Sequence, residues 1–564
     1  MSHTTTFDAI VIGSGITGGW AAKELTERGL KVLLLERGRT IEHRSGYRTE
    51  TLAPWQLPFH GQGNASLWEQ NFAIQRQSGQ LDEWNQDFWV NDREHPYESV
   101  GNESFRWYRG YHLGGRSLIW GRQCYRWSDL DFGSNARDGH GVDWPIRYAD
   151  LAPWYDHVES FIGVSGAMEG LPQLPDGKFQ PPMALNAVEA HVKRSIEAAH
   201  PDRRLTIGRT ANLTEAKPES GRTACQYRNI CSRGCSFGAY FSTQSATLPA
   251  ARATGNLTLL TDTLVEGLDF DDHSGHVRRV RVFNTRSRQH SVFSARVIFL
   301  CAGAFNSVAL MLRSTSESFP SGLGNTSGAL GHYIMDHANT LGAVALMPGF
   351  EQHSYFGNRP TGIVIPRFRN VDGDDGEFSR GYSFQGGAYR AGWTRGLSQA
   401  GIGADFKSSL RGPGAWKFVL TSFAECLPRR ENSLSLDPVQ TETDGAPRLR
   451  IQFSFGDNER RLLLDASKEA SAMLQAAGGK VIFSSTKPNP GGSAIHEMGG
   501  ARMGRDPSAS VLNGFNQVHT VANLFVTDGA AMASSACQNP SLTYMALTAR
   551  AADSAVGMLK EGAL

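Results

Sequence analysis

The chain has 564 residues, too many for one compact core, so about two to four structural units are expected. Its 56 basic and 55 acidic residues nearly cancel, which leaves no electrostatic footprint for nucleic acid. Hydrophobic residues make up 40% of the sequence, as in a packed globular protein, and no apolar run is long enough to span a bilayer. We therefore expect neither nucleic-acid binding nor a direct membrane span.

Only MSHTTT precedes the first apolar stretch, FDAIVIG. This leaves no room for the charged and apolar regions of a secretory signal peptide. We expect a cytoplasmic protein if the chain acts alone. Export to the periplasm would require association with a partner that carries the signal.

The first strong motif is typical of a strand, a glycine turn, a helix and a second strand. In the turn GSGITG, Gly13 allows a tight bend, Gly15 lets a pyrophosphate approach the backbone, and Gly18 permits close packing of helix on strand. Glu36 closes the second strand, where its carboxylate can accept hydrogen bonds from a ribose, and Arg37 follows it as a further candidate. The pattern predicts a dinucleotide site, and a purely structural glycine turn is the alternative.

A second glycine cluster lies in WYRGYHLGGRSLIWGRQCYRWS. It predicts a loop in which the backbone lies against something flat or narrow. An isoalloxazine ring would suit such a loop, and a glycine turn packed under aromatic residues is the alternative. The candidate cofactor-binding residues are Gly114, Gly115, Ser117, Trp120 and Gly121.

The C-terminal region supplies the candidate chemistry. His496 precedes a glycine-rich stretch, and NLFVTDGAAMASSACQNPSLTYMALTARAA predicts a strand, a loop and a helix. The N-terminus of that helix can present its positive dipole end to an electron-rich ring. His496 and Asn539, which precedes the helix, could meet at one site. The candidate cofactor-binding residues here are Asp528, Gly529, Pro540 and Thr543.

Three of the seven cysteines, Cys225, Cys231 and Cys235, gather in ACQYRNICSRGCSFGAYFS with the spacing C-x5-C-x3-C. Glycines let such a loop wrap closely around a metal or cluster, and closely spaced thiolates hold iron–sulfur clusters. Clusters normally take four cysteines, so the segment alone leaves alternatives open. These are a disulfide with one spare thiol, three ordinary buried cysteines, and zinc, although the segment has no histidine for a Cys3His site.

Several ordered motifs together resemble the glucose–methanol–choline (GMC) oxidoreductases, which are FAD-dependent enzymes that oxidise alcohols and sugars. The matching segments are the GSGITG turn with Glu36, GGRSLIWG, DWPIRYADLAPWYDHVE, VIFLCAGAFNSVALMLRS, GHYIMDH, HEMGGARMG and VTDGAAMASSACQNPSLTYMALTAR. The resemblance implies an α/β (α+β) fold, with a Rossmann-like FAD-binding domain and a discontinuous substrate domain built on an antiparallel sheet. We expect residues 1–50, 95–150, 220–330 and 490–564 in the FAD-binding domain, with a cysteine-rich cluster loop at 224–238. The substrate domain is expected at 335–489, with parts of 51–94 and 151–219.

The resemblance also implies a histidine, followed by a second histidine or an asparagine, at the substrate side of the flavin. Here these positions carry His496 and Asn539. Hydride transfer from an alcohol requires the hydroxyl proton to leave, and an imidazole that titrates near neutral pH is suited to accept it. We expect His496 to be the base and Asn539 to orient the hydroxyl; a core histidine with a satisfied hydrogen bond is the alternative.

Some relatives, resembling pyranose oxidase, attach FAD through a histidine in the loop after the glycine pair. This chain has Leu118, Ile119 and Trp120 there. The FAD is therefore expected to be non-covalent.

Within this family, the cysteine spacing resembles that of bacterial FAD-dependent glucose dehydrogenase catalytic subunits, in which three cysteines hold a [3Fe–4S] cluster. The resemblance implies a cytochrome c electron acceptor and a small chaperone-like subunit that carries the export signal. The segment GAYFSTQSATLPAA and its surroundings resemble glucoside 3-dehydrogenases, which oxidise the C3 hydroxyl of a pyranose or glycoside to a 3-keto sugar. Dehydrogenation of glucose at C1, of fructose, of gluconate or of a non-sugar alcohol, an oxygen-using oxidase, and a non-catalytic flavin electron-transfer subunit are the alternatives.

Overall fold

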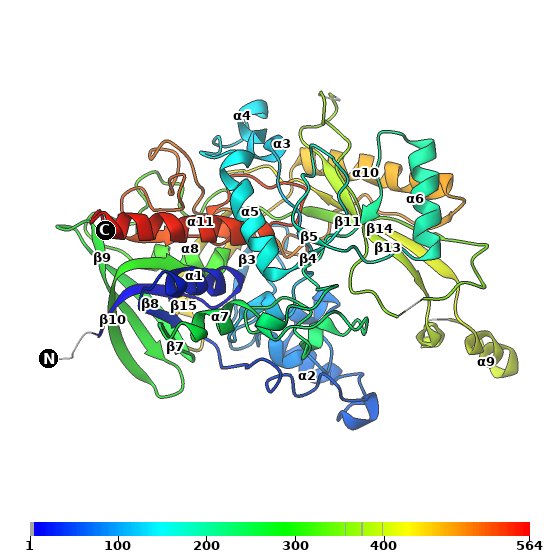
Figure 1. Ribbon diagram of the computed structural model, residues 1–564, viewed down its shortest axis with the longest axis horizontal. Helices are drawn as coiled ribbons and strands as arrows, with labels where there is room; N and C mark the ends of the chain where they lie inside the picture. The colour runs from blue at the N-terminus through cyan, green and yellow to red at the C-terminus, as the bar shows by residue number, and fades with distance from the viewer. Residues whose placement is uncertain (1–4, 356, 374–375, 398) are drawn as a thin grey trace.

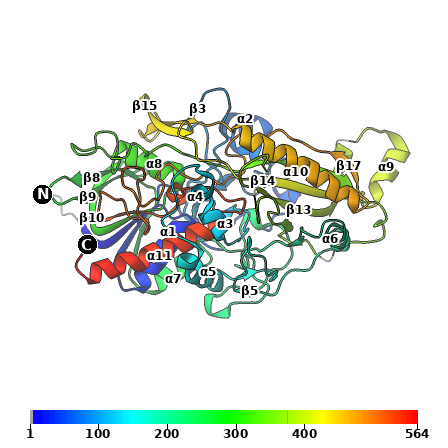
Figure 2. The ribbon, with the colours of Figure 1, turned by 90° about the horizontal axis from the view of Figure 1, so that it is seen from above.

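The computed structural model describes residues 5–355, 357–373, 376–397 and 399–564. The molecule is elongated, with one large sheet towards each end (Figure 1). The described chain begins at Thr5 within the first sheet, and both views place the C-terminus beside that sheet (Figure 2). Residues 1–4 of the predicted segment 1–50 lie outside the described part of the chain.

The first sheet contains the dinucleotide-binding pattern. Its seven strands run in the order β7-β2-β1-β10-β9-β8, with β18 paired to β10. The pairs among β7, β2, β1, β10 and β18 are parallel, and those that join β8, β9 and β10 are antiparallel. The strands are β1 (Thr5–Ile12), β2 (Val32–Leu35), β7 (Leu257–Leu260), β8 (Thr263–Asp271), β9 (His276–Asn284), β10 (Gln289–Leu300) and β18 (Leu524–Val526). All four residues of β2 are buried, as expected of a parallel strand covered on both faces.

The helix after the glycine turn, α1 (Ile16–Glu27), starts where the sequence predicts. Gly13 has a φ of +93°, which favours glycine, and its N–H donates to the Leu35 carbonyl oxygen at 2.8 Å. The turn therefore ties β1 to β2. Helix α1 packs against α11, which in turn packs against α5. The helices around this sheet are α5 (Tyr148–Ile162), α7 (Thr247–Ala253), α8 (Ala304–Arg313) and α11 (Ser541–Lys560).

The second sheet is antiparallel, with the strand order β17-β11-β14-β13-β12-β6. Along β14, buried and half-buried residues alternate, which is the two-residue period of a strand with one covered face. Helix α10 packs on β11, β14 and β17. The elements are β6 (Thr206–Ile207), β11 (Ala338–Leu346), β12 (Ile363–Ile365), β13 (Tyr382–Arg390), β14 (Trp416–Ala424), β17 (Lys480–Phe483), α6 (Ala187–Ala199) and α10 (Asp457–Ala476).

Smaller elements complete the described chain. A three-stranded sheet contains β3 (Glu98–Val100), β15 (Ser433–Thr441) and β16 (Pro447–Gln452), and β4 (Val164–Ser165) pairs with β5 (Phe179–Gln180). The short helices are α2 (Ala65–Asn71), α3 (Asp129–Phe132), α4 (Ser134–Asp138) and α9 (Gly403–Arg411). The 3₁₀ turns are η1 (Pro54–Gln56), η2 (Gln75–Ser78), η3 (Gln86–Phe88), η4 (Gly115–Leu118), η5 (Pro218–Ser220), η6 (Cys231–Arg233), η7 (Trp393–Leu397) and η8 (Gly529–Ala531).

The predicted fold class is confirmed, since a Rossmann-like α/β unit and a separate antiparallel sheet are both present. The predicted domain boundaries stay a prediction. The β15–β16 hairpin comes from the predicted substrate segment, yet it pairs with β3 and not with the antiparallel sheet. None of the helices in the described residues combines the length and apolar character needed to cross a membrane.

Gly18→Ala is expected to destabilise the protein by about 1–3 kcal/mol, because a Cβ there would overlap the carbonyl oxygen of Gly13 across the turn. Gly557→Ala is the control: it lies in α11, and an added Cβ would meet nothing within 4 Å. Alanine favours helix over glycine by up to about 1 kcal/mol, so this variant should be neutral or stabilised. Urea unfolding compares the two, and an unchanged midpoint for Gly18→Ala would contradict the packing role.

Candidate functional site

A deep cavity of about 450 Å³ joins the two halves of the molecule. Gly13, Gly15 and Glu36 line it from the first sheet, while Phe423 of β14 and His496 line it from the other side. The dinucleotide turn and the predicted catalytic histidine therefore share one cavity.

At the glycine turn, the cavity reaches the backbone directly. Gly15 lines the cavity, and a Cβ built on it would meet no atom within 4 Å. Helix α1 begins at the next residue, so its unpaired N–H groups and positive dipole end lie at the cavity wall. Gly18 lies behind the turn, packed against Gly13. An anionic group such as a pyrophosphate is what this arrangement can hold.

Glu36 lines the cavity at the end of β2. Its Oε2 accepts hydrogen bonds from the Ser14 hydroxyl at 2.5 Å and the Ser14 N–H at 3.1 Å, and its Oε1 accepts from the Gly38 N–H at 2.8 Å. Burial raises the pKa of this carboxyl despite these bonds. The side chain is thus fixed at the position where a ribose hydroxyl would approach.

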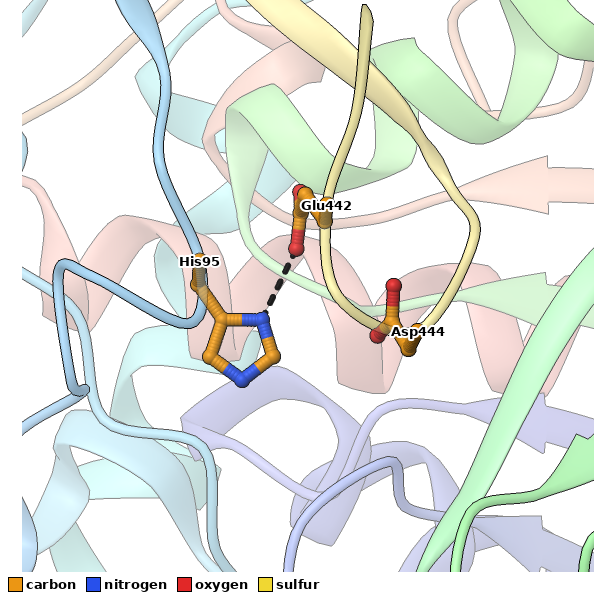
Figure 3. A group of neighbouring side chains, drawn as sticks. All are labelled: His95, Glu442 and Asp444. Atoms are coloured by element: carbon orange, nitrogen blue, oxygen red, sulfur yellow. Dashed lines mark hydrogen bonds and ion pairs between the residues drawn. The ribbon is translucent and has the colours of Figure 1, made fainter.

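Arg37 also lines the cavity, but its guanidinium points into an ion-pair group. Its Nη2 lies 3.1 Å from Glu442 and 2.6 Å from Asp444, and Glu442 is 2.9 Å from His95 (Figure 3). Burial would raise the pKa of Glu442, yet the hydrogen bond with His95 and the charge of Arg37 lower it to about 2. His95, Glu442 and Asp444 lie close enough to share one ion, but Arg37 already supplies the compensating positive charge.

The second glycine cluster forms the loop around η4. Gly114 has a φ of +83°, and its N–H donates to the Ser14 hydroxyl at 2.8 Å, which joins this loop to the first turn. Gly114 itself packs against Gln244, behind the cavity wall. The residues of this predicted set that line the cavity are Gly115, Ser117, Trp120 and Gly121.

The C-terminal candidates divide into two groups. Asp528, Gly529 and Pro540 line the cavity. The Asp528 carboxylate accepts hydrogen bonds from the Gly303 N–H and the Ser307 hydroxyl at 2.9 and 2.5 Å, and burial raises its pKa to about 6. Thr543 instead faces α5, where its hydroxyl lies 2.8 Å from that of Tyr155. Its contact is therefore with a neighbouring helix.

His496 and Asn539 meet as the sequence predicts. The Asn539 amide nitrogen lies 3.0 Å from His496 Nε2, and both residues line the cavity. Gln385 of β13 donates to Asn539 Oδ1 at 2.5 Å. Phe423 packs beside the imidazole, with ring centroids 6.1 Å apart. The pair therefore lies where the antiparallel sheet meets the cofactor half of the cavity.

Two residues that the sequence analysis did not assign hold His496 in place. His337 Nδ1 lies 2.7 Å from His496 Nδ1, and His337 Nε2 donates to the carbonyl oxygen of Ala536. The neighbouring Asp336 accepts from the backbone N–H of His496 at 3.1 Å. Both residues belong to the segment GHYIMDH, which signalled the family but carried no role by its spacing.

The environment keeps His496 neutral. Burial lowers the pKa of His496 well below its ordinary value, and His337 and Arg116 lower it further. Arg116 lines the cavity and forms a two-pronged ion pair with Glu497, at 3.1 and 2.6 Å. A neutral imidazole is the form that can accept a proton.

The three predicted metal-ligating cysteines are free thiols that line one small hollow. The Tyr227 N–H donates to Cys225 Sγ at 3.4 Å, and the Asn212 amide donates to Cys231 Sγ at 3.9 Å. The three sulfurs are not all within 4.8 Å of one another, so they are spaced more widely than ligands that share a single ion. Turn η6, which contains Cys231, packs against η4 of the cavity loop.

Sequence comparison agrees with this geometry. Two family models, both described as GMC oxidoreductase, match residues 7–339 and 428–548. The chain belongs to the GMC oxidoreductase family. It is accordingly an FAD-dependent enzyme that acts on CH–OH groups.

Two relatives of this GMC oxidoreductase match over nearly full length. The 2-methyl-1,2-propanediol dehydrogenase of Mycolicibacterium austroafricanum is 28% identical, across 97% of this chain and 94% of the relative. The fructose dehydrogenase large subunit of Gluconobacter japonicus is 25% identical, across 100% of both chains. A crystal structure of pyridoxine 4-oxidase from Mesorbium loti is similar with a TM-score of 0.61 and 18% identity, covering 98% of this chain and 99% of the other. That structural likeness supports the fold.

The cavity fits FAD by the character of its walls. The glycine turn leaves backbone exposed at a helix N-terminus, Glu36 is fixed beside it, and the buried Ser493 hydroxyl at the cavity wall has no protein partner. Gly13 and Gly15 with the first turn of α1 would hold the pyrophosphate, and Glu36 the ribose. The loop around η4 and the start of α11 would hold the ring. Bound FAD supplies an acceptor for a hydride from the substrate carbon.

His496 and Asn539 are placed to accept the proton of the substrate hydroxyl and to orient that hydroxyl. The Asn539 amide contacts His496 Nε2 in this structure, and a substrate hydroxyl would have to replace that contact. The hydroxyl would then give its proton to Nε2, while the Asn539 N–H would donate to the hydroxyl oxygen and orient it. The carbon–oxygen double bond forms as the hydride and proton leave separately. Phe423 and Trp120 contribute aromatic surface to the cavity wall.

His496→Ala should leave FAD bound but slow the reduction of the flavin by substrate by about 10²–10⁴-fold, the usual contribution of a positioned base. Stopped-flow absorbance under anaerobic conditions measures this rate. His290→Ala is the control, because the side chain of His290 is 68% exposed and pairs with Glu266 on the surface. Bleaching of the His496→Ala flavin at the wild-type rate would exclude His496 as the base.

Proposed function

We propose that this GMC oxidoreductase is a sugar dehydrogenase that oxidises a secondary hydroxyl of a pyranose or glycoside, at C3, to a 3-keto sugar. The observation that carries the sugar assignment is the set of side chains around the catalytic pair. Asn339 of β11 offers an amide and Phe423 of β14 an aromatic face, and both line the cavity, while Gln385 of β13 holds Asn539. Sugars need both, because their hydroxyls form hydrogen bonds while their apolar faces stack on rings.

The choice of C3 rests on the resemblance of the GAYFSTQSATLPAA region to glucoside 3-dehydrogenases. In the structure, this region begins next to the cavity loop: the Tyr240 hydroxyl donates to the Ser117 carbonyl oxygen, and the Thr243 N–H donates to the Ser117 hydroxyl at 3.1 Å. A fructose dehydrogenase among the relatives supports a sugar substrate in general. Glucose oxidised at C1, fructose and gluconate are the competing substrates.

We further propose that Cys225, Cys231 and Cys235 hold an iron–sulfur cluster of the [3Fe–4S] type, which would supply one-electron transfer from the flavin towards a cytochrome c. Three thiolates with wide spacing, and a backbone N–H directed at one sulfur, suit a cluster better than a single zinc ion. The contact between η6 and η4 supports short-range electron transfer, because η4 belongs to the predicted flavin loop.

A buried arginine supports an anionic occupant of the cysteine loop. Arg222 is 1% exposed, and its hydrogen bonds go to the carbonyl oxygens of Gly238 and Ile162. Its Nη2 has no hydrogen-bond partner, and Glu219, the acidic side chain that acts on it, pairs with Lys217. Burial lowers the pKa of Arg222 to about 10, while the nearby Cys235 acts to raise it. An uncompensated buried charge costs about 3–5 kcal/mol, which a negatively charged thiolate cluster would offset.

The proposed assembly has two further proteins. A cytochrome c would accept the electrons, and a small subunit carrying an export signal would take the folded chain to the periplasm. The word "large subunit" in the name of the fructose dehydrogenase relative supports a multi-subunit enzyme.

Anaerobic titration with methyl glucoside, glucose, fructose and gluconate tests the reaction. Methyl glucoside should bleach the flavin and yield a 3-keto product identified by NMR. In a second arm, reduction of cytochrome c or a synthetic dye should exceed peroxide production in air. Peroxide as the main product would favour an oxidase, like the named activity of the pyridoxine relative. No bleaching by any of these sugars would contradict a sugar dehydrogenase.

Cys231→Ser should lower the iron content and abolish cytochrome reduction, while substrate still bleaches the flavin at the wild-type rate. Cys124→Ala is the control, since Cys124 is a fully buried thiol outside the triplet. Iron analysis, electron paramagnetic resonance and flavin reduction together separate loss of the cluster from loss of the fold. Iron-free wild-type protein, purified without air, would contradict the cluster.

A further inference from the structure

We infer that His337 is a positioning residue that fixes the tautomer of His496, so that Nε2 of His496 carries a lone pair, which accepts from Asn539 in this structure and from the substrate hydroxyl once that hydroxyl replaces the contact. The inference rests on His496 being the base, as proposed above. It assigns a role to a histidine that touches the base and not the substrate.

A backbone carbonyl fixes the position of the hydrogen on His337. The Ala536 carbonyl oxygen can only accept a hydrogen bond, so the His337 Nε2 beside it carries the hydrogen. In a neutral imidazole the other nitrogen then has a lone pair. His337 Nδ1 therefore accepts from His496 Nδ1 across the 2.7 Å contact, and the hydrogen of His496 is held on Nδ1. His496 Nε2 is left as the acceptor.

The hydrogen bonds on the other side of His496 run in the same direction. The Gln385 amide nitrogen donates to Asn539 Oδ1 at 2.5 Å, which leaves the Asn539 amide nitrogen to donate to His496 Nε2 at 3.0 Å. Four side chains from separate parts of the sequence thus form one directed row of hydrogen bonds. If the His496 hydrogen lay on Nε2, two lone pairs would face each other at Nδ1 and two N–H groups would face each other at Nε2.

Packing holds His337 in this orientation. It is 1% exposed and precedes β11, and its ring lies nearly perpendicular to that of His496, with centroids 4.8 Å apart. Phe423 packs edge-on against it at 6.1 Å. Asp336 accepts a hydrogen bond from the backbone N–H of His496. Asp336 thus holds the backbone of His496, and the adjacent His337 holds its ring.

A proton taken up by His496 enters at Nε2, on the opposite side of the ring from His337. The hydrogen on His496 Nδ1 stays in place, with His337 Nδ1 still accepting it. Burial lowers the pKa of both histidines. The charged groups that face His496 are Arg116, which opposes a positive charge, and the carboxyls of Asp336 and Glu497.

Two substitutions separate the acceptor role from simple filling of space. His337→Asn keeps an oxygen where Nδ1 lies, so it should retain flavin reduction within about tenfold of wild type. His337→Leu fills similar space but accepts no hydrogen bond, so His496 can turn its hydrogen to Nε2. Flavin reduction should then fall by about 10²-fold, within the range that a general base contributes. The loss should lie in the reduction rate constant, with FAD content unchanged and a smaller change in substrate affinity.

A pH profile and a direct view of the tautomer complete the test. In wild type, kcat/KM should fall only as the pH drops through the pKa of His496, which lies below 6.5, because the neutral form is the base. His337→Leu should lower the plateau of this profile. In ¹⁵N-histidine-labelled wild-type holoenzyme, the His496 signal should show hydrogen on Nδ1 and the His337 signal hydrogen on Nε2. The two signals are assigned by their loss in His496→Ala and His337→Asn.

Three results would overturn the inference: wild-type reduction rates in His337→Leu, equal losses in His337→Asn and His337→Leu, or hydrogen on Nε2 of His496 in wild type. The third result is measured on wild-type protein, so it tests the inference even if a variant fails to fold. If the flavin of His496→Ala is reduced at the wild-type rate, His496 is not the base. If only the flavin of His337→Leu is reduced at that rate, His496 can still be the base, but His337 does not position it.

Discussion

The hydrogen bond between the Ala536 carbonyl and His337 is the interaction on which the site depends. A carbonyl oxygen has no hydrogen to give, so it sets the direction of every bond that follows, through His496 and Asn539 to Gln385. These groups are buried, and an unpaired donor or acceptor in that position would cost about 1–3 kcal/mol. The same bonds that satisfy the buried groups therefore also leave His496 ready to accept a proton.

Buried carboxyls in and near the cavity wall are also held by hydrogen bonds. Glu36, Asp336 and Asp528 are buried carboxyls, and each accepts hydrogen bonds from backbone N–H groups. Burial raises the pKa of Asp336 to about 7, with the charge of Glu497 adding to it. The protein thus holds these loops by hydrogen bonds from the backbone, while Arg116 and Arg37 have carboxylate partners of their own.

The charges in and beside the cysteine loop are only partly balanced by neighbouring side chains. Arg228 and Arg233 pair with Glu50 and Asp82. Arg222 is buried with no partner for its Nη2, and Cys235 and Glu219 both act to raise its pKa. Arg122 lies on the other side, over the ring of Tyr240, with hydrogen bonds to the carbonyl oxygens of Trp120 and Pro360. Two cations beside three thiols suit a site whose occupant is anionic. Its contact with η4 connects this site to the flavin loop.

The sequence by itself determined the family, the fold class and the pairing of His496 with Asn539. Gly13 has a positive φ and Gly18 has no room for a Cβ, so the spacing of these two glycines is visible in the sequence. Roles that depend on distant contacts were not visible. Thr543 lies in a cofactor motif but bonds to Tyr155, and Arg37 follows the ribose-binding position but pairs with Glu442 and Asp444. His337 was present in a recognised motif, yet only the tertiary structure brings it to His496, because a hydrogen-bond partner 159 residues away leaves no periodic signal in the chain.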